Sequence, residues 1–194
     1  MAGVFLLPAL AADTQSLAPQ APYEPPSMKD RWNWYVRDTF GPGAAFRTGF
    51  VAAMDHAGND PPEWEQGMAG FGRRAASRYG RFAIQETIEL GGGALLGEDP
   101  RYHPCDCSGF FRRSGHALAS TIVARNASGN LTPAFARIAG IYGGSMLATY
   151  LWYPSRFTAA GDGFRLGNIS LGVSGGVNLM REFWPDIKRV FRRD

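Results

Sequence analysis

The hydrophobic and polar positions of this chain follow the period of an α-helix over most of its length. From residue 28 onward, apolar residues recur every three or four positions, and stretches rich in Gly and Pro separate these patterns. Apolar residues at this spacing lie on one face of a helix. The sequence therefore predicts a mainly α protein, a compact bundle of about six Gly/Ala-rich helices. The expected helices cover residues 29–39, 44–57, 63–97, 114–125, 133–153 and 164–181, and Pro185 opens a short basic helix after them.

Start and stop residues support several of these boundaries. Ser27 is placed to cap the first helix. Thr132 is placed to cap the helix that begins with Pro133, since proline is favoured at the first helical position. The stretch from Gly161 to Gly163 is expected to break the chain before the next helix.

The segment Ile169–Met180 fits two patterns. Its apolar residues alternate with small or polar ones, which is the period of a strand and would give an α+β fold or a small barrel. The same segment carries a helical stripe, and its neighbours are helical with no matching hairpin partner. We therefore expect a helix, with a stripe formed by Leu166, Ile169, Val173, Val177 and Met180.

Two runs without charged residues stand out, at 138–153 and 166–180. As helices they would be about 24 and 22 Å long at a rise of about 1.5 Å per residue, which is shorter than a hydrocarbon core of about 30 Å. Aromatic residues follow or end both runs, as is common at membrane interfaces. Two interpretations stay open: helices packed within a soluble domain, or segments that insert into or dock on a membrane.

Glycine recurs at four-residue spacing in and around these runs. A small residue at every fourth position lets two helix backbones approach closely. We therefore expect close helix packing at the pairs Gly140/Gly144, Gly172/Gly176, Gly163/Gly167 and Gly93/Gly97.

The first 28 residues differ in composition from the rest. Residues 1–12 form an apolar run that leads into small residues, which is typical of a signal peptide, although the basic n-region is missing. Residues 13–28 carry four prolines and are expected to form a Pro-rich linker. The prediction is an exported protein, in the periplasm or associated with a membrane of the cell envelope, with a single helical domain over 29–194.

Composition and charge restrict the partners. Hydrophobic residues make up 45% of the chain, which is enough for a core, and the net charge of +3 is too small to suggest nucleic acid. The basic, aromatic tail over 181–194 suits anionic lipid and suits docking on the domain equally. An envelope protein, membrane lipid or a second copy of the chain is the expected partner. The predicted contact residues are Trp152, Tyr153, Trp184, Lys188, Arg189, Arg192 and Arg193.

One loop holds both cysteines of the chain. Cys105 and Cys107, with His103 and His116, offer the thiolate and imidazole groups that bind zinc or copper. The usual zinc spacing is Cys-x2-Cys, however, and a second cysteine pair is missing. Three states stay open for the cysteines: a small, strained and reducible disulfide, a bond to a partner, or free thiols. We expect no cofactor, with zinc or copper at these four residues as the alternative.

Motifs for catalysis are incomplete. Residues 172–176 have the Gly-x-Ser-x-Gly spacing of a hydrolase elbow, but the last histidine, His116, precedes them. Glu86 and Glu89 lack the Glu-x-x-His motifs of di-iron proteins, and we expect them to pair with arginines. Neither lysine follows the glycines of a P-loop. No catalytic residue is predicted, and the chain is not expected to be an enzyme.

Five strings stand out together along the chain, at Pro61–Trp64, Ala76–Gly80, Glu98–Tyr102, Ala160–Gly163 and Arg181–Lys188. Together they resemble a family of exported proteins from soil bacteria. The resemblance covers about residues 30–193. That family has no assigned activity, cofactor or catalytic residue, so the resemblance implies an envelope address and no mechanism.

Two hypotheses of function follow from the sequence. The leading one is a non-enzymatic structural or membrane-associated protein of the cell envelope with closely packed, Gly-faced helices. The alternative is a small metal-binding or redox protein that uses the loop with His103, Cys105 and Cys107. A binding module should tolerate the loss of that loop, whereas a metal-binding or redox protein should not.

Overall fold

A computed structural model describes residues 23–191 of the chain. Within this range the structure contains six α-helices, one short 3₁₀-helix and a two-stranded sheet, which confirms the predicted mainly α bundle. The predicted signal peptide at 1–12 and most of the predicted linker at 13–28 lie outside the described residues. The elements are α1 (Met28–Phe40), α2 (Pro42–Ala57), η1 (Pro62–Trp64), α3 (Gly67–Leu96), α4 (Phe110–Ala119), β1 (Val123–Arg125), β2 (Leu131–Pro133), α5 (Phe135–Trp152) and α6 (Gly161–Phe191).

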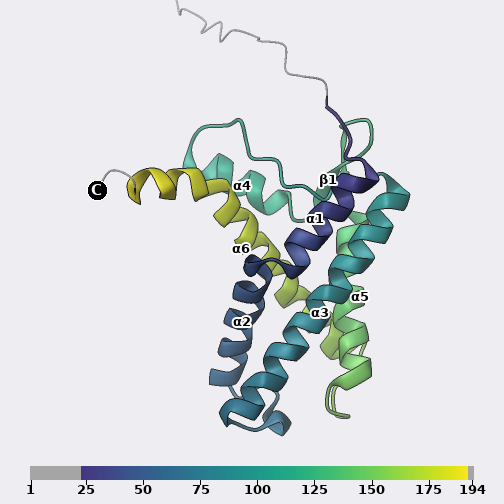
Figure 1. Cartoon of the computed structure of the whole chain (residues 1–194), viewed down its shortest axis with the longest axis vertical. Helices are drawn as coiled ribbons and strands as arrows, with labels where there is room; N and C mark the ends of the chain where they lie inside the picture. The colour runs from purple at the N-terminus through teal and green to yellow at the C-terminus, as the bar shows by residue number, and fades with distance from the viewer. Residues whose placement is uncertain (1–22, 192–194) are drawn as a thin grey trace, which may run out of the picture.

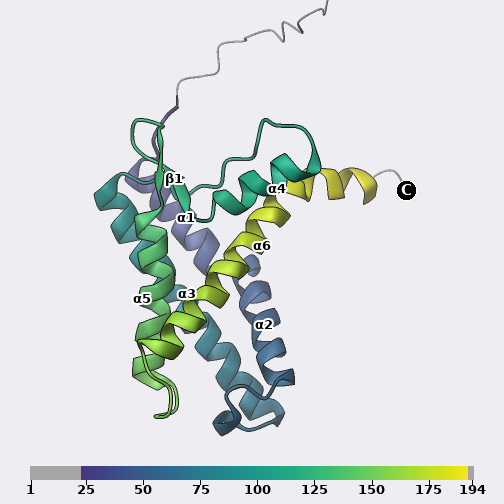
Figure 2. The same cartoon turned by 180° about the vertical axis from the view of Figure 1, so that it is seen from behind.

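The central helix of the bundle is α3. It packs against α5 and α2, and α1 packs against it as well. As Figures 1 and 2 show, α6 crosses the bundle obliquely, and it packs against α5 and then against α4. The sheet, α4 and the end of α6 lie at one end of the molecule, which we call the hairpin end. The opposite end, which we call the η1 end, carries η1 and the connection from α5 to α6.

A helix is predicted over residues 114–125, and both of these bounds are wrong. α4 begins at Phe110 and ends at Ala119, and the chain then forms an antiparallel hairpin in which Ala124 pairs with Thr132. Each strand of this hairpin has only three residues. Strands of that length are too short to show an alternating pattern, so the helical pattern around them dominated the prediction.

Thr132 and Pro133 lie in β2 and do not cap α5, contrary to the prediction. The carboxylate of Glu98 takes that place, because its Oε1 accepts from the backbone N–H of Phe135 at 3.0 Å and its Oε2 from that of Ala136 at 3.1 Å. A carboxylate at this position also interacts favourably with the helix dipole. The cap comes from a distant part of the sequence, and local patterns therefore do not reveal it.

Residues 161–191 form one continuous helix, α6. The stretch from Gly161 to Gly163 opens this helix instead of preceding it, and Pro185 lies inside it instead of opening another. Figure 1 shows α6 bending towards its C-terminal end, as expected where a proline removes one backbone hydrogen bond. The segment Ile169–Met180 is helical throughout, so the helix prediction is confirmed and the strand alternative is wrong.

Glycines allow the close contact between α3 and α5. A Cβ atom at Gly140 would lie 2.6 Å from the carbonyl oxygen of Gln85, and Gly144 faces the α3 backbone in the same way. The predicted packing role is confirmed for this pair. It is wrong for Gly172 and Gly176, where a Cβ would meet no heavy atom of another part of the described chain within 4 Å.

Few large apolar side chains lie inside the bundle. In the described range 23–191, most of the buried hydrophobic residues are alanines, and only Phe82, Ile141 and Leu166 are larger. Polar and charged side chains such as Arg74 and Glu182 occupy much of the remaining interior. Among residues 23–191, no helix combines the length and the apolar content that a membrane span requires.

The glycine contact between α3 and α5 predicts the effect of two alanine substitutions. Gly140→Ala should destabilise the protein by about 1–3 kcal/mol, because the new methyl group collides with the Gln85 carbonyl. Gly172→Ala is the matched control, and it should be neutral or stabilise by about 0.5–1 kcal/mol, because its methyl group enters open space. Urea unfolding followed by circular dichroism measures both, and equal effects would contradict the close approach of the two helices.

Candidate functional site: a polar cavity and the disulfide loop

A cavity of about 230 Å³ lies between α2, α3 and α6. Because α6 packs along α5 and α4, it leaves this space between itself and the pair α2 and α3. The loop over residues 100–103 and the hairpin line the cavity at the hairpin end. Many charged and polar side chains line the cavity, although more of its accessible wall is apolar than polar, and it is partly open to solvent. The residues that α3 contributes are Arg78, Arg81, Phe82, Gln85, Glu86 and Glu89.

Asp38 connects three helices at this cavity. Its Oδ1 accepts from Nη2 of Arg181 at 2.8 Å, and its Oδ2 accepts from Nη2 of Arg47 at 3.4 Å. One carboxylate therefore links α1, α2 and α6. Glu89 plays the same part between α3 and α5, because it accepts from Nε of Arg137 at 2.9 Å. Pairing of this kind compensates charges that are largely removed from water.

Glu86 has no cationic partner among the described residues. Its Oε1 accepts one hydrogen bond, from Nε2 of Gln85 at 3.3 Å. Burial, with the charges of Glu89 and Asp38 nearby, raises the pKa of Glu86 to about 8. Glu86 is therefore mainly protonated at pH 7. The expected arginine partner is present for Glu89 and absent for Glu86.

Arg81 is a second unpaired group in the wall of this cavity. Its side chain is almost fully buried, and its Nη1 has no acceptor in the described part of the chain. Burial, with the charge of Arg78 nearby, lowers the pKa of Arg81 to about 10. The guanidinium group therefore stays charged at pH 7. No carboxylate in the described chain hydrogen-bonds it, and the nearby carboxylate of Asp55 is already bonded to Arg78.

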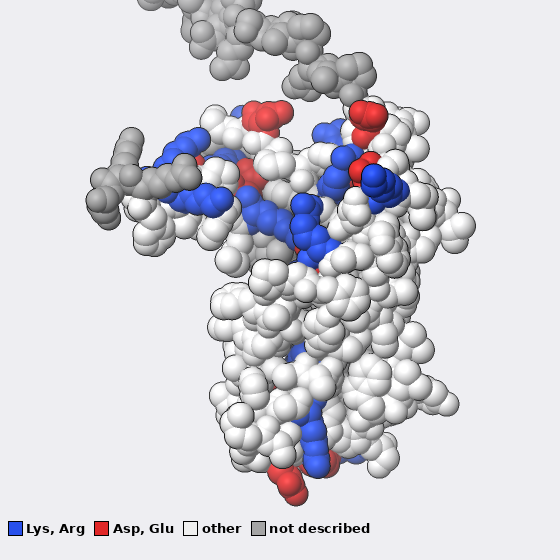
Figure 3. Space-filling model, in the orientation of Figure 1, with Lys and Arg blue, Asp and Glu red and all other residues white. Residues whose placement is uncertain are grey.

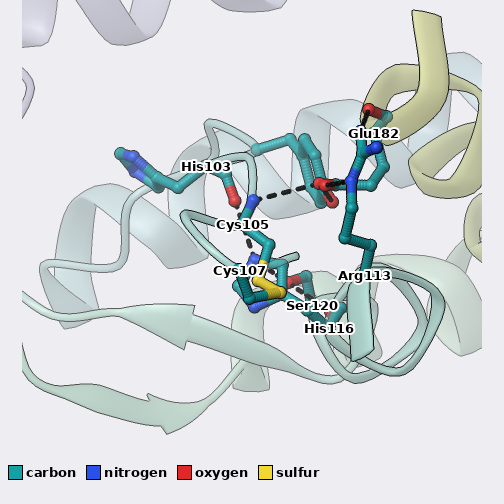
Figure 4. The surroundings of a disulfide bond; sticks show 8 residues. His103, Cys105, Cys107, Arg113, His116, Ser120 and Glu182 are labelled. Atoms are coloured by element: carbon teal, nitrogen blue, oxygen red, sulfur yellow. Dashed lines mark hydrogen bonds and ion pairs between the residues drawn. A yellow bond between two sulfur atoms is a disulfide. The ribbon is translucent and has the colours of Figure 1, made fainter. Parts of the chain in front are cut away.

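The loop between α3 and α4 contains a disulfide between Cys105 and Cys107, which are two residues apart (Figure 4). Glu182 of α6 holds this loop, because its Oε2 accepts from the hydroxyl of Tyr102 at 2.6 Å and from the backbone N–H of Cys105 at 3.0 Å. Its Oε1 accepts from Nε of Arg113 of α4 at 2.8 Å. Figure 4 shows Cys105 and Arg113 meeting this carboxylate from two sides. The loop, α4 and α6 are therefore joined through Glu182.

Asp99 anchors the beginning of the same loop. Its carboxylate is fully buried and accepts from the hydroxyl of Tyr23 at 2.9 Å and from Nε of Arg101 at 2.9 Å. Nε2 of His103 lies 3.0 Å from it. Burial alone would raise the pKa of Asp99, but the hydrogen bonds from Arg101, Tyr23 and His103 outweigh this and lower it to about 2. The string Glu98–Tyr102 therefore has a structural role.

The four residues predicted as metal ligands do not come together as one site. The sulfurs of Cys105 and Cys107 are bonded to each other. His103 contacts Asp99, and Nε2 of His116 lies 2.9 Å from the carbonyl oxygen of His103. Among residues 23–191, no group of three or more His, Cys, Asp and Glu side chains is placed to hold a metal ion. This geometry gives no support to zinc or copper binding at the loop.

The residues predicted to contact a membrane or partner lie at opposite ends of the molecule. Trp152 and Tyr153 are at the η1 end, where α5 finishes. Nε1 of Trp152 donates to Oγ of Ser77 at 2.8 Å, and the ring of Tyr153 lies 5.0 Å from that of Trp64. These two aromatic residues therefore pack partly on their own fold.

The rest of the predicted contact residues belong to the end of α6, at the hairpin end. Trp184 is about half exposed, and Nζ of Lys188 lies 5.4 Å from the centre of its ring. Arg189 is exposed and forms an ion pair with a neighbour one turn earlier on α6. Arg192 and Arg193 lie outside the described residues. The seven residues therefore do not form one continuous surface.

The buried arginines of α3, two of which line the cavity, are not evident from the hydrophobic pattern. Arg74, Arg78 and Arg81 recur at helical spacing on α3, and charged residues are ordinarily assigned to the solvent face. All three are buried in the structure. The available signal was the spacing itself, because arginines every three or four residues define one face of a helix as clearly as leucines do.

Comparisons with known proteins provide no relative whose site could guide the interpretation of this one. No family model matches the chain, and neither a curated protein nor a solved structure shows significant similarity to it. The interpretation of the cavity and the loop therefore rests on their own geometry.

The role of Glu182 predicts a large difference between two neighbouring acids that share Arg113. Glu182 is buried, and Glu182→Gln should destabilise the protein by about 2–3 kcal/mol, because the neutral amide cannot accept all the hydrogen bonds that Tyr102, Cys105 and Arg113 donate to the carboxylate. Asp186 binds the same arginine but its side chain is 42% exposed, so Asp186→Asn should cost less than about 1 kcal/mol. Chemical unfolding of both variants tests this, and similar losses would contradict the assignment of Glu182 as the anchor.

The raised pKa of Glu86 predicts how stability depends on pH. Its pKa is 4.5 as the ordinary value and about 8 in the folded protein, so the folded state binds the proton more tightly. Stability should therefore fall as pH rises from about 4.5 to 8, by up to about 1 kcal/mol per pH unit for this group. Glu86→Gln should remove this part of the slope. Unfolding measured at pH 5 and pH 8 checks it, and parallel profiles for the variant and the wild type would disprove it.

Proposed function

We propose that this protein is a non-enzymatic, membrane-associated component of the cell envelope and that lipid covers its apolar surface. The observation that supports this is the distribution of side chains, with large apolar residues outside and charged residues inside. Soluble monomers rarely expose large apolar patches and rarely bury charged side chains. Part of this exposed apolar surface, which we call the apolar collar, consists of these side chains of α2, α5 and α6: Phe46, Phe50, Met54, Leu147, Tyr150, Leu151, Phe164, Ile169 and Met180.

Charged side chains on the central helix α3 and on the helices of the apolar collar point inward or lie near the two ends. On α3, every charged residue after Arg73 is buried or half-buried. On α5 the one charged residue is Arg137, which pairs with Glu89. Figure 3 shows that on one face the charged residues gather at the hairpin end and the η1 end, with a broad and largely uncharged band between them. Lipid chains can cover such a band without removing many charges from water.

The hairpin end provides basic groups next to the apolar collar. Arg112, Lys188 and Arg189 are exposed there. Each Lys or Arg close to an anionic membrane surface contributes about 1 kcal/mol to binding, so this end suits lipid headgroups. The signal-peptide pattern at 1–12 supports the envelope address. The incomplete catalytic motifs support a role other than catalysis.

Cell fractionation of the tagged full-length chain, followed by a carbonate wash, tests the proposal. We expect the wild type to stay in the membrane pellet. Phe50→Glu combined with Leu151→Glu should release most of it, because two carboxylates would have to enter lipid. Phe111→Glu combined with Leu131→Glu is the matched control, because these two residues are similarly exposed but lie outside the apolar collar.

Light scattering of the washed fractions separates the other outcomes. A wild-type chain that is monomeric in the supernatant without detergent would contradict the proposal. A larger oligomer in the supernatant would contradict it too, because a second copy of the chain would then cover the apolar collar. Retention of the Phe50→Glu, Leu151→Glu variant at the level of its matched control would show that the collar does not contact lipid.

A further inference from the structure

We propose that the polar cavity binds a small oxyanion, with the buried guanidinium of Arg81 as its main ligand. This inference goes beyond membrane association and does not depend on it, because it rests on the interior of the bundle. The chemistry that Arg81 recognises is a phosphate, sulfate or carboxylate group, whether on a free anion or on the head of a small anionic lipid.

Arg81 lacks a hydrogen-bonded counter-ion in the described part of the chain. Arg74, Arg78 and Arg137 of this bundle all have an acceptor: backbone carbonyls for Arg74, Asp55 for Arg78 and Glu89 for Arg137. Arg81 has no such acceptor in the described part of the chain, although only 6% of it is exposed. An isolated charge in a protein interior is strongly unfavourable, so a charged arginine at this place needs a negative group from elsewhere.

Several free donors line the same cavity. Nη1 of Arg81, Nη1 of Arg78 and Nε of Arg47 are all buried without an acceptor in the described chain, and all three side chains line the cavity. Buried donors are normally satisfied, and three buried guanidinium nitrogens without an acceptor at one cavity therefore point to a shared acceptor, although Arg47 and Arg78 each also bond a carboxylate. The fork of N–H groups on a guanidinium matches the oxygens of a carboxylate or phosphate.

The balance of charge in the cavity also points to an anion. Most of its other basic residues are paired with carboxylates, whereas Arg125 donates only to the carbonyl oxygen of Gly129 in the described chain, and no acid of the lining hydrogen-bonds Arg81. Asp38 accepts from Arg47 and Arg181, and Glu89 accepts from Arg137. Glu86 has no cationic partner, and burial keeps it mainly protonated at pH 7. The cavity therefore carries a net positive charge.

The cavity is large enough for a small oxyanion. The cavity volume of about 230 Å³ corresponds to several water molecules at about 30 Å³ each, which leaves room for a phosphate ion with part of its hydration shell. Ser170, Ser174 and Asn178 of α6 line the side opposite the arginines and offer further hydrogen-bonding groups.

Thermal unfolding of the full chain in a non-ionic detergent, with and without inorganic phosphate, tests this inference. We expect phosphate to raise the wild-type Tm saturably, by about 5–10 °C at a hundredfold excess over Kd, relative to sodium chloride of equal ionic strength. Arg81→Met should abolish this rise. It should also raise the Tm in phosphate-free buffer, because it removes an uncompensated buried charge. Arg73→Gln is the matched control on an exposed arginine of the same helix, and it should respond to phosphate as the wild type does.

Equilibrium dialysis of the wild type with radiolabelled phosphate provides a readout that does not depend on any variant, and we expect one site per chain. A short-chain phosphatidylglycerol is the second probe: competition with labelled phosphate would identify a lipid headgroup as a ligand, and its absence would identify a free anion. No saturable phosphate binding, or an unchanged Tm response in Arg81→Met, would overturn the inference. A lower Tm of Arg81→Met in phosphate-free buffer would also overturn it, because Arg81 would then be satisfied without an anion.

Discussion

Buried charged side chains, and the groups that compensate them, determine how the elements of this bundle fit together. Arg74 is fully buried and donates to the carbonyl oxygens of Asp60, Pro61 and Glu65, which fixes the loop at the η1 end against α3. Glu182 does the same for the disulfide loop at the hairpin end. An uncompensated charge costs more in the interior than an apolar group of similar size gains, so each of these contacts restricts the positions of the elements it joins. The bundle therefore keeps its arrangement although few large apolar side chains lie inside it.

The same constraint connects the two proposals. Because charged groups occupy the interior, large apolar residues have to lie outside, and the apolar collar is the result. Several charges inside are paired across helices, as Asp38 pairs with Arg47 and Arg181, and Arg74 is compensated by backbone carbonyls, whereas Arg81 has no acceptor in the described chain. Lipid outside would cover the exposed apolar collar. An anion in the cavity would accept hydrogen bonds from the arginine nitrogens that have no acceptor in the described chain.

Much of the fold could be predicted from sequence, because helix periodicity, the Ser27 cap and the Gly/Pro breaks are local signals. Ser27 indeed forms a capping box with Asp30. The hairpin could not be predicted, because its strands are very short, and neither could the cap of α5, because Glu98 reaches it from a distant part of the chain. The candidate site was harder still. The hydrophobic pattern assigns charged faces to solvent, and the buried arginines of α3, such as Arg81, reverse that rule.

Hydroxyl-radical footprinting of the full chain reconstituted in lipid vesicles is the most direct test of the central claim that lipid covers the apolar collar. The account predicts that Phe50 and Tyr150 are strongly protected from oxidation in vesicles. Phe111 and Leu131, which are comparably exposed at the hairpin end, should stay reactive. Equal reactivity of the two pairs of residues would contradict the account, because the apolar surface would then face water or another protein.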